Sequence, residues 1–202
     1  MDDNFTLNPD RAIKLSEKII KQGWDLTWGA QSHVNIIVNN PGMVRMMARA
    51  GLKWIFLGFE SGSQEVLNGY GKKALVQDAL KAIEILKEND VEVTGSFILG
   101  ALDETKEMMK ETINFAKRLN PSRAQFTILT PYPGTKLYEI VKDRLLTKIW
   151  EIYTCLHPTI KLDHISPEEL RRLLIMAYFS FYGRLANSLG TCPIFIRYLS
   201  AS

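Results

Sequence analysis

Helical and strand-like patterns of apolar residues alternate along most of this chain. Four segments carry apolar residues at three- and four-residue spacing, which is typical of amphipathic helices: 9–22, 41–50, 75–89 and 108–119. Each is followed by a short apolar run that indicates a strand: 26–31, 54–59, 91–99 and 124–129. This alternation predicts an α/β fold with a parallel sheet and right-handed crossovers. Both an open doubly wound sheet and a closed or partial barrel fit the pattern.

Residues with special backbone preferences mark the ends of the first two helices. Asn8 and Asn40 each precede a proline, and an N-cap residue followed by proline predicts a helix start. Gly23 and Gly51 follow the last apolar positions of the same two segments. A glycine at that place can end a helix in left-handed geometry.

The C-terminal third has a different organisation. The turn cluster Pro131–Thr135 leads into a further short helix, and Ser166 with Glu169 forms a capping box at the start of a long one. That helix is apolar on most sides over 173–182, so either this chain or a partner must cover it. We therefore expect a partial barrel over 1–146 and a mostly helical extension over 147–202.

Composition narrows the classes of function. The 202 residues include 46% hydrophobic and 23% charged side chains, with a net charge of +3. This balance gives no electrostatic argument for a nucleic-acid or membrane surface. No apolar run approaches the 18 or so residues of a membrane span, and we find no secretory signal, so we expect a cytoplasmic domain. Two cysteines, Cys155 and Cys192, are too few for a disulfide framework or for three or four cluster thiolates.

Candidate chemistry lies just after the predicted strands, because parallel β/α folds bind ligands beyond the carboxyl ends of their strands. Glu60 follows the second strand and precedes Ser61-Gly62-Ser63. A carboxylate there suits a ligand with an amine or a diol. The structural alternative is that Glu60 pairs with a neighbouring cation while Ser61 or Ser63 caps a helix.

Other polar groups are weaker candidates. Gly95 and Gly100 let a backbone or a flat ligand approach closely, although strand packing with a turn at Gly100 explains them better when the segment is taken alone. His33 follows the first strand and is more typical of a surface position. Cys155, His157 and His164 lack the paired spacing of a zinc site, so we interpret their proximity in sequence as accidental.

Taken together, the strand-end segments resemble the later part of the radical S-adenosylmethionine (SAM) enzymes, in particular the subfamily that often carries an upstream cobalamin-binding domain. The segments that carry the resemblance are Asp2-Asp3-Asn4-Phe5-Thr6, Gly58-Phe59-Glu60-Ser61-Gly62-Ser63, Gly95-Ser96-Phe97-Ile98-Leu99-Gly100 and Thr130-Pro131-Tyr132-Pro133-Gly134-Thr135. The likeness extends from about residue 2 to residue 183. Each motif is weak alone, and their order makes the set specific.

The resemblance implies an incomplete TIM-like (β/α) barrel that holds SAM and a [4Fe–4S] cluster, with cobalamin bound by an upstream domain in this subfamily. It implies radical-based or cobalamin-dependent methyl transfer or rearrangement on an unidentified small-molecule substrate. By position, the cofactor-binding residues would be Asp3 at the methionyl amine, Glu60 at the amine or ribose, Ser96 at the ribose, and three residues around the adenine. These three are Ile98, Gly100 and Thr130.

The departures from the family pattern leave a second hypothesis open. The family's Cys-x-x-x-Cys-x-x-Cys loop precedes the segment at which this chain begins, so the cluster ligands and the first strands are expected in an upstream segment or a second chain. His33-Val34-Asn35 stands where the family commonly has Arg-Val-Asp. The alternative is a catalytically inactive remnant or an interaction module on the same scaffold. A third reading is an unrelated β/α enzyme with Glu60 as general base.

Overall fold

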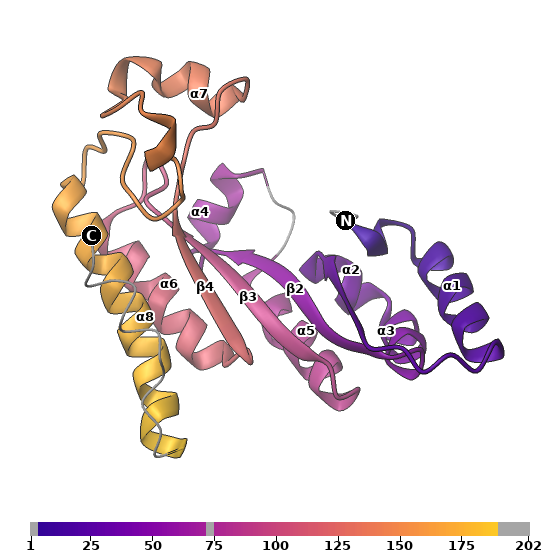
Figure 1. Cartoon of the computed structure of the whole chain (residues 1–202). Coiled ribbons are helices and arrows are strands. Elements are labelled where there is room, and N and C mark those ends of the chain that lie inside the picture. The colour runs from indigo at the N-terminus through magenta and orange to yellow at the C-terminus, as the bar shows by residue number, and fades with distance from the viewer. Residues whose placement is uncertain (1–3, 72–74, 190–202) are drawn as a thin grey trace.

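The computed structural model describes residues 4–71 and 75–189, with side chains as far as residue 183. Four parallel strands form one open sheet in the order β1-β2-β3-β4 (Figure 1). Their bounds are Trp28–Ser32 for β1, Leu52–Glu60 for β2, Glu92–Leu99 for β3 and Arg123–Ile128 for β4. The expected parallel α/β sheet is confirmed, and β1 and β4 are its edges.

The long helices predicted from apolar spacing are present. They are α1 (Pro9–Lys21), α3 (Pro41–Arg49), α5 (Val76–Glu88), α6 (Lys106–Leu119) and α8 (Pro167–Leu189). Helices α3, α5 and α6 cover one face of the sheet, and α8 runs beside β4 (Figure 1). Because the four strands are parallel, their C-terminal ends lie at the same end of the sheet.

Several short elements lie in those connections. They are η1 (Phe5–Leu7), α2 (Val34–Asn39), α4 (Gln64–Gly69), α7 (Lys136–Val141), η2 (Lys142–Arg144) and η3 (Trp150–Ile152). The pattern analysis did not predict α2 or α4, because six residues are too few to show helical periodicity. The predicted helix after Thr135 is α7, and its N-cap threonine accepts a hydrogen bond from the Tyr138 amide.

Asn8 caps its helix as expected, whereas Asn40 is the N-cap residue of α3 without a capping hydrogen bond from its side chain. The Asn8 side chain accepts a hydrogen bond from the Arg11 amide at 3.0 Å, and Pro9 is the first residue of α1. Gly51 has φ +96, and a Cβ there would lie 1.8 Å from the Leu26 carbonyl oxygen, so only glycine fits. In the capping box, the Glu169 amide donates to Ser166 Oγ at 3.2 Å, and the Ser166 amide donates to Glu169 Oε2 at 3.4 Å.

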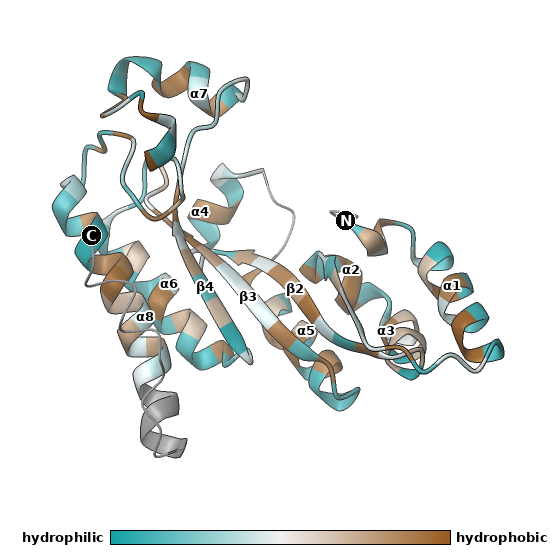
Figure 2. Cartoon of the chain, viewed as in Figure 1, coloured by the Kyte–Doolittle hydropathy of each residue, from teal (hydrophilic) through white to brown (hydrophobic). Residues whose placement is uncertain are grey.

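The two faces of the sheet differ in burial. Side chains that point toward the helices are buried and mostly apolar, with Phe97 at the centre, stacked between Phe59 and Phe126 at ring distances of 5.6 and 5.3 Å. Figure 2 shows the matching hydrophobic stripes on the helices and strands. The alternate positions form a second, less buried face, here called the inner face. Its members are Gly29, Gln31, Trp54, Phe56, Gly58, Thr94, Ser96, Ile98, Gln125 and Thr127.

Helix α8 is covered by this chain along one side. Leu173, Leu174, Ala177 and Phe181 are buried in the core. Phe179 on the other side is 52% exposed, so this chain covers only one side of the helix. Among the helices of the described residues, none combines the length and hydropathy needed to cross a membrane.

Candidate functional site

Glu60 ends β2 in a strained backbone conformation. Its φ is +62, and the Ser61 amide donates to the Phe59 carbonyl at 2.8 Å across it. An i to i+2 hydrogen bond around a residue with positive φ defines the rare, strained form of the γ-turn. The β2–β3 register also shifts between Gly58 and Glu60. Strain of this kind persists where surrounding structure enforces it, and it is concentrated at functional sites.

A buried hydroxyl network holds the Glu60 turn in place. Ser61 is fully buried, and its Oγ lies 2.9 Å from Thr112 Oγ1 of α6. The Gly62 amide donates to Thr112 Oγ1 at 3.0 Å, and the Ser63 amide donates to Ser61 Oγ at 3.0 Å. Ser63 is the N-cap residue of α4 by position, but its side chain makes no capping hydrogen bond, so the expected cap is present in place only. Thr112 lies within the helix predicted over 108–119, and nothing in the sequence had singled it out.

Glu104 holds the turn after β3 in place through hydrogen bonds to the backbone of that turn. Its Oε2 accepts hydrogen bonds from the amides of Gly100 and Ala101, at 2.7 and 3.0 Å. The residue is 1% exposed, and this burial raises the pKa of the carboxyl to about 7 against the two amide bonds that lower it. Its other oxygen, Oε1, is buried without a hydrogen-bond partner among the described residues. The sequence analysis gave no role to Glu104, because its burial depends on the tertiary structure.

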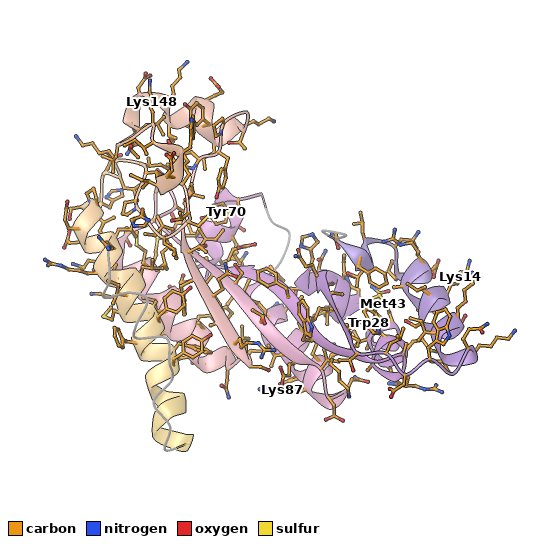
Figure 3. All side chains as sticks on the ribbon, in the orientation of Figure 1. Lys14, Trp28, Met43, Tyr70, Lys87 and Lys148 are labelled. Atoms are coloured by element: carbon orange, nitrogen blue, oxygen red, sulfur yellow. The ribbon has the colours of Figure 1, made fainter. Side chains whose placement is uncertain are left out.

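Tyr70 follows α4 and lies at the end of the sheet where β2 and β3 finish (Figure 3). Its hydroxyl is buried and, within the described residues, makes no hydrogen bond. Burial raises the pKa of the phenol well above its usual value, and the carboxylates of Glu104 and Glu60 raise it further. Tyr70, Glu60 and Glu104 all come from the segments that follow β2 and β3 at this end of the sheet, and the three residues are here called the strand-end cluster. No motif in the sequence had pointed to Tyr70.

Of the other predicted site residues, Ser96 and Ile98 belong to β3. Ser96 and Ile98 lie on the inner face of β3 and are half-buried. Ser96 pairs with Gly58, and the next register pair joins Phe97 to Glu60, so Ser96 and Glu60 lie within one register step on neighbouring strands. Asp3 lies outside the described residues.

Gly100 and Thr130 both make contacts within the protein. Gly100 has φ +83, and a Cβ there would meet Leu170 and Leu162 at 3.0 and 3.3 Å, so this glycine packs against the first turn of α8 and the segment before it. Thr130 is 8% exposed, and its hydroxyl donates to the Ile128 carbonyl at 3.0 Å. The Leu129 amide still bonds Leu99, which sets Thr130 beside the Gly100 turn.

The described residues do not fit an iron–sulfur cluster or a zinc ion. They include no group of three His, Cys, Asp or Glu side chains that could hold a metal. Cys155 contacts the Tyr132 hydroxyl at 3.2 Å, and the His157 Nδ1 contacts Thr154 at 3.1 Å. His33 is exposed at the start of α2.

A groove of about 230 Å³ runs beside the edge strand β1. Its walls are mostly apolar and come from η1, α1 and β1: Phe5, Leu15, Ile19, Trp28, Gly29, Ala30 and Gln31. A sheet edge of this kind presents backbone groups to which a further strand can bind.

Comparison with known proteins identifies related sequences. The family described as the Radical SAM superfamily matches residues 1–116. An uncharacterised methyltransferase of Pyrococcus horikoshii is 42% identical over 186 residues, covering 91% of this chain and 40% of the relative. The anaerobic magnesium-protoporphyrin IX monomethyl ester cyclase of Rubrivivax gelatinosus is 28% identical over 181 residues, covering 90% and 33%. The chain thus spans well under half the length of these relatives.

A solved structure shares the fold. The radical SAM methyltransferase TsrM from Kitasatospora setae, with cobalamin and a [4Fe–4S] cluster bound, matches with a TM-score of 0.63 at 18% identity. The match covers 71% of this chain and 28% of that protein. The expected likeness to the open barrel of these enzymes is confirmed.

Proposed function

This chain belongs to the radical SAM superfamily, and from this premise we propose that it forms the SAM-binding part of an enzyme that transfers a methyl group to a small-molecule substrate. SAM and a [4Fe–4S] cluster are the cofactors of the superfamily. When bound, SAM supplies the activated methyl group. The residues of this chain bind and orient it.

The single observation that carries the proposal is the strained turn at Glu60. A backbone conformation that costs about 1–3 kcal/mol is held by the buried bonds among Ser61, Gly62 and Thr112. A ligand gives a reason for a carboxylate at this position, because glycine would adopt the same φ more easily. Glu60 can accept charge-assisted hydrogen bonds from the amine or from the ribose hydroxyls of SAM.

The inner face supports the same assignment. Ser96 lies within one register step of Glu60 and offers a hydroxyl, and Ile98 offers an apolar surface one pleat further along β3. We assign Ser96 to the ribose and Ile98 to the adenine. Gly100 and Thr130 shape the end of this surface through their backbone, because Gly100 packs on Leu170 and the Thr130 hydroxyl is bonded to Ile128.

The cluster ligands belong to sequence outside the described residues. We propose that an upstream segment adds the missing strands at the β1 edge, where the groove between η1 and α1 lies. We assign the strand-end cluster to SAM, whereas the described residues include no group that could hold the iron–sulfur cluster. Cobalamin, which TsrM binds, would belong to a further domain.

Methyl transfer is favoured over other reactions by two similarities. The relative at 42% identity is named a methyltransferase, and the matching TsrM structure is one as well. The related cyclase acts on a tetrapyrrole ester according to its name. This supports a small organic molecule as the substrate class.

The test is SAM binding to the full-length, cluster-loaded protein by calorimetry. Glu60→Gln removes one charge-assisted bond, and we expect SAM affinity to fall about tenfold. Glu65→Gln is the matched control, because Glu65 is an exposed carboxylate on α4, five residues away. Equal affinity of the Glu60→Gln variant and the wild type would remove the role given to Glu60.

Iron content separates the proposed enzyme from the alternatives. Anaerobic reconstitution of the full-length protein should give a brown sample with about four irons per chain. A colourless protein that also fails to bind SAM would instead favour a non-catalytic remnant. Activity in air without iron or SAM would favour an unrelated enzyme with Glu60 as general base.

A further inference from the structure

The long helices of this chain pack in a row, and α1 lies at one end of it (Figure 1). Helix α8 packs on α6, α6 on α5, α5 on α3 and α3 on α1. Ala12, Ser16 and Ile19 of α1 are buried, whereas the neighbouring stripe of the same helix is exposed. In a fold of successive β/α units, each helix packs beside the helix of the next unit. The exposed stripe of α1 is therefore the place at which the row of helices can be continued.

A groove of about 760 Å³ follows this stripe and is here called the α1 groove. It shares Phe5 and Leu15 with the smaller apolar groove beside β1, so the two grooves adjoin. Leu15, at their boundary, is 42% exposed. An apolar groove at an open strand edge fits a further strand, and a groove along a helix fits a further helix. The two grooves together have the layout of one more β/α unit. Besides Phe5 and Leu15, the lining residues of the α1 groove are Asn8, Asp10, Arg11, Lys14 and Lys18.

Charge distinguishes the α1 groove from the groove beside β1. Among the described residues that line it, Arg11, Lys14 and Lys18 are cations and only Asp10 is a carboxylate. Within the part of the chain that the structure describes, the side chains of Lys14 and Lys18 form no hydrogen bond or ion pair. Figure 3 shows Lys14 at the outer edge of the molecule. The Arg11 guanidinium is held in place, because it donates to the Phe5 carbonyl at 3.1 Å and lies 5.6 Å from the centre of the Phe5 ring.

The spacing of the three cations defines what can face them. Positions 11, 14 and 18 are three and four residues apart, so their side chains lie along one stripe about 10 Å long. A helix packed at the usual interaxial distance of about 8–10 Å places a stripe of its own side chains opposite. A complementary stripe has an apolar side chain against Leu15 and carboxylates one or two turns apart against the cations.

We infer that an acidic amphipathic helix of the upstream segment covers the α1 groove and pairs its carboxylates with Arg11, Lys14 and Lys18. The inference rests on the proposed function, which includes that segment, and it adds the chemistry of the contact. The Pyrococcus horikoshii relative matches this chain over 40% of its own length, so more than half of that protein lies outside the match. A β/α unit takes only roughly 30 residues.

Zero-length crosslinking of the full-length wild-type protein tests the inference. A carbodiimide joins a lysine amine to a carboxylate in direct contact, with loss of water, and mass spectrometry of the peptides identifies both residues. We expect Lys14 and Lys18 to be joined to aspartate or glutamate residues of the upstream segment that lie three or four positions apart. Lys110 is the control, because it is an exposed lysine on α6 and should give no crosslink to that segment.

Charge reversal provides an independent measurement. Lys14→Glu combined with Lys18→Glu should lower the urea midpoint of the full-length protein at low salt. The difference from the wild type should shrink in about 1 M salt, where the Debye length is only about 3 Å. Lys110→Glu should shift the midpoint less at low salt. A loss of equal size at both salt concentrations would contradict the proposed ion pairs.

Other occupants of the α1 groove would give different results. Crosslinks from Lys14 or Lys18 to a second copy of the chain, or no crosslink from them to the upstream segment, would overturn the inference. If the same protein binds SAM, the proposed function stands despite that result. Crosslinks to upstream carboxylates in a protein that does not bind SAM would overturn the proposed function and leave the contact at α1 intact.

Discussion

The hydroxyl of Tyr178 in α8 forms two hydrogen bonds with the backbone of Phe126 in the edge strand β4. It donates to the Phe126 carbonyl at 2.9 Å and accepts from the Phe126 amide at 3.1 Å. One helical turn later, Tyr182 repeats both bonds with Ala124, at 2.9 and 3.1 Å. The two tyrosine hydroxyls therefore satisfy backbone groups of β4 that would otherwise be open to pairing with a further strand. With β4 covered, β1 remains the edge at which the sheet can grow.

Tyr178→Phe should destabilise the protein by about 1–3 kcal/mol, because the amide and carbonyl of Phe126 lose their partner while the ring still packs. Its ring lies edge-on to Phe126 at 5.4 Å, and this contact is retained by phenylalanine. Urea unfolding provides the measurement. Tyr138→Phe serves as the control with little expected change, and equal stability of the Tyr178→Phe and wild-type proteins would contradict the role of the hydroxyl.

The buried carboxyl of Glu104 should make stability depend on pH. Its pKa is raised from 4.5 to about 7 in the folded protein. The native state therefore binds the proton more tightly than the unfolded state. The free energy of unfolding should fall as the pH rises from about 4.5 to 7, by about 3 kcal/mol in total, and level off above that range.

Glu104→Gln isolates this effect, because glutamine keeps an oxygen for the amides of Gly100 and Ala101. The difference in unfolding free energy between wild type and variant, measured with urea at pH 5 and pH 8, should change in favour of the variant at pH 8. A difference that stays constant across this range would show that Glu104 does not titrate there.

Thr112→Val should destabilise the Glu60 turn. The valine keeps the shape of the side chain and removes the hydroxyl that bonds Ser61 and the Gly62 amide. Leaving these buried groups unpaired costs about 1–3 kcal/mol. Thr112→Ser is the matched control, since it retains the hydroxyl. Urea midpoints of the three proteins give the comparison, and a valine variant as stable as the serine variant would refute the network.

Glu60→Gly should separate stability from ligand binding. Relief of the positive φ should raise the free energy of unfolding by about 1 kcal/mol, while the loss of the carboxylate weakens SAM binding. Asp90→Gly is the matched control: Asp90 has φ +55 in the turn before β3, so the same relief is expected there without an effect on SAM. Calorimetry and urea unfolding on both variants would decide, and a less stable Glu60→Gly protein would contradict the strain argument.

Much of the architecture could be predicted from local patterns. The helix starts at Pro9 and Pro41, the capping box at Ser166 and the four apolar strands each depend on residues close together in the sequence. Glu60 could be named as a candidate because parallel strands end at one edge, and Ser96 because its segment resembles one of the radical SAM enzymes. The short helices α2 and α4 escaped because their six residues show no clear period.

The sequence by itself determined the order and type of the elements, because spacing of apolar residues and capping chemistry act over a few neighbouring positions. Only the tertiary structure decided which polar groups lose their water. It buried Glu104 and the Tyr70 hydroxyl, brought Thr112 to Ser61 across 51 positions, and set Tyr178 on Phe126 across 52. These contacts join segments far apart in the chain. Burial, and with it the raised pKa of Glu104, arises only when such segments pack together, so local sequence patterns do not reveal it.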